Sequence, residues 1–176
     1  MRTRLLALCA LAGCALGSTS ALAASGNASA MQGTAQAVIV VPLKITAGTS
    51  LRFGQFANAT TGGTLTIDPT GAVSTAGGMV GANTFTQTGT GRGNATFSVT
   101  GNPNAAFGVT VSTNVQLANG ANRMSVTGFT GNVVGSAAAL DTTGNFTLNV
   151  GATLNVAANQ AVGTYSGTYV LTVVYQ

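Results

Sequence analysis

The clearest pattern in the chain is the alternation over its last fourteen residues, 163–176. Gly163 is the first residue of this stretch. Large apolar side chains then occupy every odd position except Gly167: Tyr165, Tyr169, Leu171, Val173 and Tyr175. The intervening positions are mostly polar. This period of two predicts a strand with one buried face that continues to the penultimate residue. Because chain ends usually fray, we expect this end to be paired within a sheet.

Shorter alternations predict the remaining strands. The first lies in residues 34–45, where Ala35, Ala37, Ile39 and Val41 share one parity and form a candidate donor or edge strand. Pro42 has no amide N–H, which favours a sheet edge. Further short strands are expected at 51–56, 65–67, 83–87, 95–99, 107–111, 124–129, 146–150 and 154–156, with hairpin turns at 101–104 and 151–152 and an irregular stretch over 72–93. About eight short strands with regular turn signals predict an all-β fold, an immunoglobulin-like antiparallel β-sandwich.

The beginning of the chain predicts export. Arg2 and Arg4 precede an apolar run, and Ala21-Leu22-Ala23 resembles a signal-peptidase site, so residues 1–23 are expected to be a cleaved signal peptide. A lipoprotein-like box ending at Cys14 offers a second processing route, in which Cys14 would carry a lipid. Residues 24–33 are small and polar and predict a flexible tail. Residues 34–176 then form a single domain, with no transmembrane segment after processing.

Composition narrows the set of partners. The formal net charge is +4, but two of the six cations lie in the predicted leader and the other four are scattered, so nucleic acid is not expected as a partner. Both cysteines also lie in the leader, which leaves no disulfide and no thiolate metal site after cleavage at Ala23. Charged residues make up only 5% of the chain. Weak repulsion between copies is compatible with assembly.

The sequence contains few residues that could act in catalysis. The chain has no His or Glu, and its two carboxylates, Asp68 and Asp141, stand in turn sequences. Lys44 is expected to point outward from an edge strand, and the glycine-rich residues 88–93 lack the strand–loop–helix context of a phosphate loop. We therefore expect no enzyme, no catalytic or metal residue and no cofactor.

Two resemblances add to this picture. The C-terminal strand, with a penultimate aromatic at Tyr175 and a glycine fourteenth from the end at Gly163, resembles the last strand of chaperone–usher pilus subunits. Five segments in order also resemble a bacterial family of exported domains of unknown function (DUF 4402): residues 35–37 with 41–43, 51–54, 97–101, 144–154 and 163–168. That resemblance implies an exported, β-rich, Gram-negative domain similar to pilin and spore-coat-type subunits, without an established activity.

These observations leave alternatives open. The leading hypothesis is an exported structural or adhesive subunit of a surface fibre that assembles by β-strand addition. Its partners would be other copies or related subunits, with a periplasmic chaperone and an outer-membrane usher during assembly, and it would pass through the periplasm to the cell surface or an extracellular fibre. The alternative is a self-complete monomeric binding domain, periplasmic or lipid-anchored. A small outer-membrane barrel fits less well, because the expected strands are short and Trp is absent.

Overall fold

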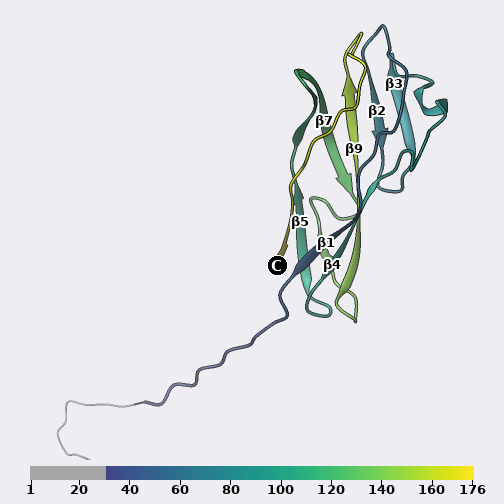
Figure 1. Cartoon of the computed structure of the whole chain (residues 1–176). Helices are drawn as coiled ribbons and strands as arrows, with labels where there is room; N and C mark the ends of the chain where they lie inside the picture. Colours follow the sequence, from purple (N-terminus) through teal and green to yellow (C-terminus); the bar gives the residue numbers. More distant parts are fainter. Residues whose placement is uncertain (1–30) are drawn as a thin grey trace, which may run out of the picture. The chain divides into compact units, whose positions relative to one another are not determined.

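The computed structural model describes residues 31–176, which form ten strands and one short 3₁₀ helix (Figure 1). The strands are β1 (Lys44–Thr49), β2 (Gly63–Ile67), β3 (Val73–Gly77), β4 (Ala95–Thr100), β5 (Ala106–Val111), β6 (Asn114–Asn119), β7 (Asn122–Gly131), β8 (Ala137–Ala139), β9 (Asn145–Val156) and β10 (Leu171–Tyr175), and the helix is η1 (Ala82–Thr84). All paired strands are antiparallel and form a seven-stranded and a three-stranded sheet, consistent with a β-sandwich. In this part of the chain no helix is long and apolar enough to span a bilayer.

The twelve-residue strand β9 is the spine of the larger sheet. Val150 pairs with Ala95 of β4 on one side and with Gly131 of β7 on the other. Further along, Leu154 pairs with β2 on one side and again with β7 on the other. Strands β4 and β2 therefore follow one another along one edge of β9, while β7 lies along the opposite edge. Strands β1, β3 and β6 extend the sheet from β4, β2 and β7 respectively.

Two groups of buried side chains divide the core along β9. The first group contains Phe53, Leu65, Ile67, Met79, Val115, Met124, Val126, Ala152, Leu154 and Val156. The second group contains Ala95, Val99, Phe107, Val109, Leu140, Leu148 and Val150. Half-buried Leu51, Phe129 and Tyr169 pack against both groups. The period-two pattern of β9 thus supplies buried residues to both cores from one continuous strand.

The second layer of the sandwich differs between these two cores. Over the second core, β10, β5 and β8 form a hydrogen-bonded sheet, and Phe107 of β5 meets Phe146 of β9 edge-to-face at 5.2 Å. None of the buried residues of the first core comes from that sheet. Among the described residues, the first core is covered by residues 51–58 and 160–169, which lie outside the named strands. Strands therefore form the second layer of the sandwich over the second core only.

Several sequence predictions are confirmed. The all-β fold in two antiparallel sheets is as expected, with ten strands where about eight were predicted. Strands lie at 63–67, 95–100 and 106–111, and the turn at Asp68 closes with a hydrogen bond from Gly71 N to the Asp68 carbonyl at 2.9 Å. The strand predicted over residues 163–176 is shorter in the structure, because β10 begins at Leu171. Across the predicted stretch the odd positions from Tyr165 onward are half-buried, apart from Gly167, and the even positions are exposed. The facing of that strand was correctly read from its sequence.

Other predictions about strand pairing were wrong. The expected hairpin turn at 151–152 does not exist, since β9 continues through it. The expected hairpin of β4 with β5 is also wrong, because the two strands lie in different sheets. Residues 51–56 form one bridge, between Arg52 and Gly93, rather than a strand. Strands β3, β6 and β8 were not predicted, and residues 83–87 contain part of η1 instead of a strand. The errors about hairpins concern a choice of partner, which local alternation does not specify.

The strand expected from Thr34 begins ten residues later, at Lys44. Residues 31–38 fall in a different unit from Ile39–Gln176, and all of them are exposed and without strand structure. Pro42 offers no N–H for pairing, and no described strand pairs with Ala35, Ala37, Ile39 or Val41. The predicted signal peptide and residues 24–30 of the predicted tail lie outside the described residues.

Candidate functional site

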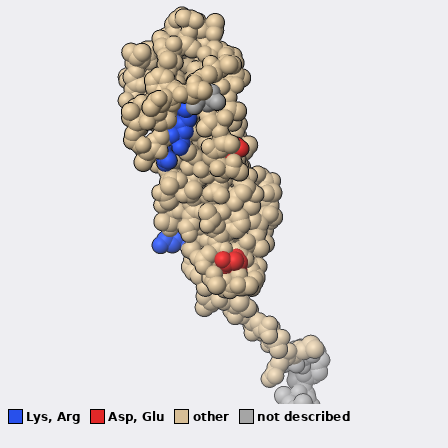
Figure 2. All heavy atoms as spheres, turned by 90° about the vertical axis from the view of Figure 1, so that its right-hand side faces the viewer, with Lys and Arg blue, Asp and Glu red and all other residues tan. Residues whose placement is uncertain are grey.

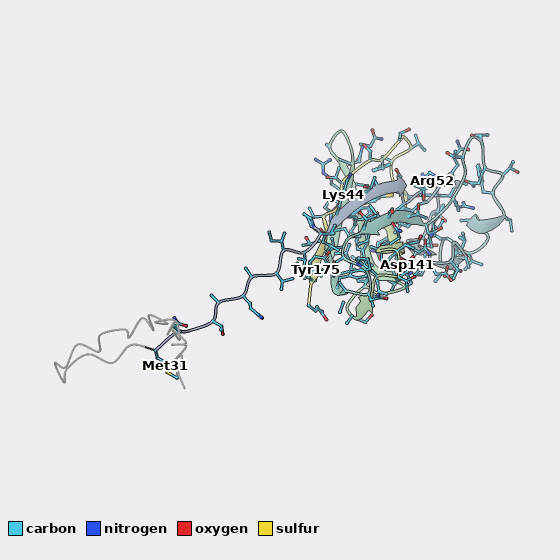
Figure 3. The ribbon with its side chains drawn as sticks, turned by 90° about the horizontal axis from the view of Figure 1, so that it is seen from below. Met31, Lys44, Arg52, Asp141 and Tyr175 are labelled. Carbon is cyan, nitrogen blue, oxygen red and sulfur yellow. The ribbon has the colours of Figure 1, made fainter. Side chains whose placement is uncertain are left out.

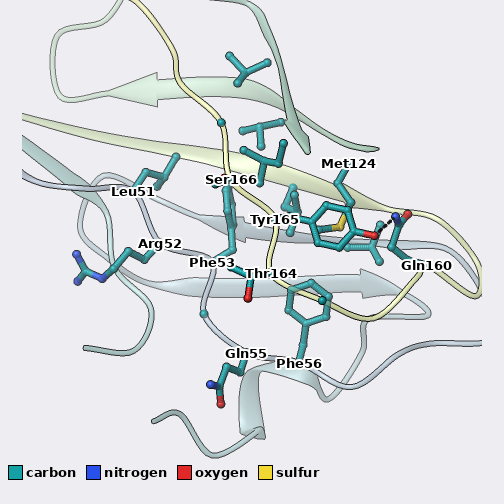
Figure 4. A pocket seen from close by; sticks show the side chains of 18 of the residues that line it. Leu51, Arg52, Phe53, Gln55, Phe56, Met124, Gln160, Thr164, Tyr165 and Ser166 are labelled. Atoms are coloured by element: carbon teal, nitrogen blue, oxygen red, sulfur yellow. Dashed lines mark hydrogen bonds between the residues drawn. The ribbon is translucent and has the colours of Figure 1, made fainter. Parts of the chain in front are cut away.

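A groove opens over the first core, where the second layer lacks strands. Its volume is about 580 Å³. The floor consists of apolar side chains from three strands of the larger sheet: Val115 and Leu117 of β6, Met124 and Val126 of β7, and Leu154 and Val156 of β9. We call residues 51–56 the first wall and residues 160–169 the second wall. Figure 4 shows Phe53 and Phe56 of the first wall, with Tyr165 of the second wall beside Met124.

The backbone of the second wall and of β10 is paired along one edge. Ser166 exchanges hydrogen bonds of 2.8 and 3.1 Å with Ala118 of β6, Val170 accepts from Ser112 N at 3.0 Å, and β10 pairs residue by residue with β5. Ser166, Val170 and Gln176, whose backbone groups make such bonds with Ala118, Ser112 and Ala106, are all even positions. Because backbone groups alternate in direction along an extended chain, those of the odd positions face the opposite edge. Within residues 31–176 no strand pairs with that edge.

The core-facing side chains of the same stretch are incompletely buried. Tyr165, Tyr169, Leu171, Val173 and Tyr175 all point toward the core, and each remains only half-buried. A strand inside a complete sandwich would bury most of this surface, as β9 does with Leu148, Val150 and Leu154. The C-terminal stretch therefore has both an unpaired backbone edge and unfilled apolar contacts.

Two tyrosines show how this stretch is nevertheless held. Tyr169 packs against Phe129, with ring centroids 5.2 Å apart, and burial raises the pKa of its phenol. The Tyr175 hydroxyl donates to the Val41 carbonyl and accepts from Asn102 N–H, both at 2.7 Å. The penultimate residue thus fixes the end of β10 to the chain just before β1. Gly163 lies at the start of the stretch, outside any strand, with φ of 144°.

The segment before β1 exposes its apolar side chains. Ile39 is 98% exposed and Val38 is 85% exposed, whereas Val40 and Val41 are about half exposed. Figure 3 shows side chains branching from both sides of the stretch between Met31 and Lys44. Exposure of four consecutive β-branched residues is unusual in a soluble surface, and such a segment favours extended structure against an apolar partner.

The predicted turn carboxylates both behave as the sequence indicated. Asp68 Oδ1 accepts hydrogen bonds from the Thr70 hydroxyl at 2.7 Å and from its N–H at 2.8 Å. The Thr70 hydroxyl, together with nearby backbone N–H groups, lowers the pKa of Asp68. In the matching turn, the backbone N–H of Asn145 and then the Thr143 hydroxyl lower the pKa of Asp141. Both carboxylates are committed to local turns.

Charged groups are sparse elsewhere. Figure 2 shows a face with a few separate charged side chains on an otherwise uncharged surface. Lys44 is exposed at the start of β1. The described residues contain no cluster of three or more potential metal-ligating His, Cys, Asp or Glu side chains. The arrangement is suited to contacts made through backbone groups and apolar side chains.

The sequence analysis identified one boundary of this site but missed the site itself. It marked the odd positions from Tyr165 to Tyr175, which form the open edge. It did not predict that Leu117 and Met124 would lie on the floor of a groove, or that Phe53 and Phe56 would form the opposite wall. The glycine at position 54 within the expected short strand was the available signal, because positive φ at Gly54 (70°) keeps the first wall from forming a regular strand.

Comparisons with known proteins place the chain in a family without assigning an activity. No curated protein and no solved structure matches it. One protein family, described as "Domain of unknown function (DUF4402)", matches residues 43–175, which is well over half of the chain. The match begins just before β1 and ends with the last residue of β10, so it includes both walls and the floor of the groove. The chain belongs to the DUF4402 family.

Proposed function

We propose that this protein is an exported structural or adhesive subunit of a bacterial surface fibre, similar to a pilin, that assembles by β-strand addition. The observation that carries the proposal is the groove over the first core, bordered by an unpaired backbone edge. Strand addition uses main-chain hydrogen bonds for affinity and alternating side chains for register. The groove offers both, because Tyr165 and Tyr169 line it with half-buried side chains, and within the described residues no strand pairs with the backbone edge formed by the odd positions of the second wall.

The donor strand in this proposal is the segment containing Ala35, Ala37, Ile39 and Val41, provided by another copy or a related subunit. Its β-branched residues are exposed and it has no strand partner in the described chain. A contact between one surface of a subunit and a different surface of the next is heterologous, and it generates open chains when the rotation does not close. A fibre follows from this geometry without any catalytic step. During export, a periplasmic chaperone and an outer-membrane usher would protect and order the open edge.

One observation favours the alternative, a self-complete monomeric domain, periplasmic or lipid-anchored, that binds a ligand. Tyr175 holds the Val41 carbonyl at the end of β10, which fixes the chain just before β1 to the last strand. At about 3.3 Å per residue, residues 35–41 would span about 20 Å, the length of residues 169–175. The same segment would then complete its own domain.

Natively exported full-length protein on an unboiled denaturing gel separates the two functions. We expect a ladder of multimers that collapses on boiling. Ile39→Asp should abolish the ladder and leave the thermal melt of the monomer unchanged, because Ile39 is 98% exposed in the single chain. Val80→Asp is the matched control, since Val80 is also largely exposed but lies outside both groove and donor segment, and its ladder should persist.

Each other result has a definite meaning. A single band from wild type would contradict the fibre, and a lowered melting temperature of Ile39→Asp would then support self-completion. A ladder that survives Ile39→Asp would show that the donor strand is not this segment.

A further inference from the structure

The backbone of the first wall is held at Gln55 by a side chain that takes the place of a neighbouring strand. The Gln87 carboxamide accepts a hydrogen bond from Gln55 N–H at 2.7 Å and donates one to the Gln55 carbonyl at 2.8 Å. A paired residue of an antiparallel strand exchanges the same two bonds with its partner. Gln87 thus occupies the position of a peptide group on a missing strand.

A second side chain completes this contact. Arg92 donates from Nε to the Phe53 carbonyl at 2.9 Å, and from Nη2 to the carbonyls of Gln55 at 2.6 Å and Ala82 at 2.7 Å. The planar guanidinium can reach several carbonyls at once because its donors have fixed directions. Arg92 therefore ties the first wall to the loop that contains η1 (Ala82–Thr84).

Gly54 allows the two side chains to reach the backbone. Its φ of 70° lies in the region that glycine adopts most easily. A Cβ at this position would overlap the Gln87 side-chain oxygen and stand 2.6 Å from Arg92 Cγ. The bend at Gly54 and the contacts of Gln87 and Arg92 therefore depend on one another.

We infer that Gln87 and Arg92 are positioning residues of the groove: they hold residues 53–55 so that the first wall keeps its place beside the groove for an incoming strand. This inference rests on the proposed function. Within the described chain the only backbone bridge of this wall is that between Arg52 and Gly93, and beyond it these two side chains make the hydrogen bonds to the backbone of Phe53 and Gln55. Their loss leaves the seven-stranded sheet paired, because neither residue belongs to a named strand.

The test compares full-length monomer of the wild type, Gln87→Met and Gln55→Met. Methionine retains the length of glutamine and removes only its polar atoms. Gln55→Met is the matched control, because the Gln55 side chain bonds Thr88 and the Gln55 backbone would keep its contacts with Gln87. The probe is a fluorescein-labelled synthetic peptide of residues 31–43, and its binding is measured by anisotropy. Hydrogen exchange at residues 53–56 and a thermal melt are recorded on the same samples.

We expect Gln87→Met to bind the peptide about tenfold more weakly, since two neutral hydrogen bonds of modest net strength are lost. Amide exchange at residues 53–56 should accelerate while protection of β9 stays as in the wild type. Gln55→Met should bind like the wild type. If Gln87→Met fails to fold, Arg92→Lys replaces it, because lysine keeps the charge and loses the forked geometry, and weaker binding is again expected.

Three results would overturn the inference. Unchanged peptide affinity and amide exchange in the folded Gln87 or Arg92 variant would show that the wall needs neither side chain. Equal losses in Gln87→Met and Gln55→Met would indicate a general disturbance of the wall. Absence of peptide binding by the wild type would contradict the proposed function and this inference together.

Discussion

Replacing Gly151 with alanine tests the central role of β9. Gly151 is buried in the middle of the strand, where β4 ends its pairing and β2 begins. An added Cβ would overlap the Ile67 carbonyl oxygen and stand 2.6 Å from the Asp68 carbonyl carbon and 2.8 Å from Asp68 Cα. These are backbone atoms at the end of β2, so no side-chain rotation relieves the contact. The end of the β2–β9 ladder must move instead, and with it Ile67, which is fully buried.

The expected cost follows from that displacement. Overpacking a filled core costs about 1–3 kcal/mol, and we place this substitution at the upper end because the obstructing atoms are backbone. Reduced freedom of the unfolded chain returns roughly 0.4–1 kcal/mol when glycine becomes alanine. The net loss is about 2 kcal/mol. For a domain of this size, each kcal/mol shifts the melting temperature by about 2–4 °C, so a decrease of roughly 4–8 °C is expected.

Gly108→Ala provides the control. Gly108 is also buried in a strand, β5, but its added Cβ would stand 2.7 Å from Nε2 of Gln176, the end of a flexible C-terminal side chain. Rotation of that side chain removes the contact, so the melting temperature should change by less than about 2 °C. Thermal unfolding followed by circular dichroism measures both variants. Equal melting temperatures would refute the argument that β9 has no space at Gly151.

Three further predictions concern the core, the last strand and the turns. Leu154→Ala should lower the free energy of unfolding by about 2–5 kcal/mol in urea denaturation, because Leu154 is buried between β2 and β7; a smaller loss would mean that the first core collapses around the cavity. Val173→Asp should lower the free energy of unfolding by about 1–3 kcal/mol, because it places a carboxylate on the half-buried face. Thr172→Asp, at an exposed position, should lower it much less, and equal melting temperatures of the two variants would contradict the observed facing. The lowered pKa of Asp68 and of Asp141 means that both carboxylates stabilise the fold above the ordinary carboxyl pKa and lose this effect as pH falls through their folded values. Stability should therefore decrease below about pH 4, and the double Asn variant should show a flatter acid profile in thermal melts.

Much of the local structure could be predicted from the sequence. Alternation assigned the facing of residues 165–175, because successive side chains of an extended chain must point to opposite sides. The turn at Asp68 was predicted from a carboxylate followed by proline and glycine, a combination that forms the same local hydrogen bonds in many folds. The family resemblance drawn from five short segments is confirmed over residues 43–175. The proposed assembly role of Gly163, Tyr165 and the later odd positions stays a prediction.

The local pattern of side chains could not predict which strands pair with one another. The same alternation at 146–156 fits a hairpin or one long strand, and the contact of Gly151 with the end of β2 belongs to the long strand. The sequence around residues 101–104 indicates a turn, but whether the chain returns in the same sheet depends on the other strands that compete for each edge.

The sequence by itself determined the strands near 63–67, 95–100 and 106–111 and the facing of residues 165–175, because these properties arise between neighbours along the backbone. Only the tertiary structure decided that β9 serves two cores and that strands cover just one of them. It also decided that the first wall is held by Gln87 and Arg92, more than thirty residues further along the chain. The physical reason is that the groove lies where a backbone edge has no neighbouring strand. An unpaired edge can be identified only when the pairing of all the other strands is known.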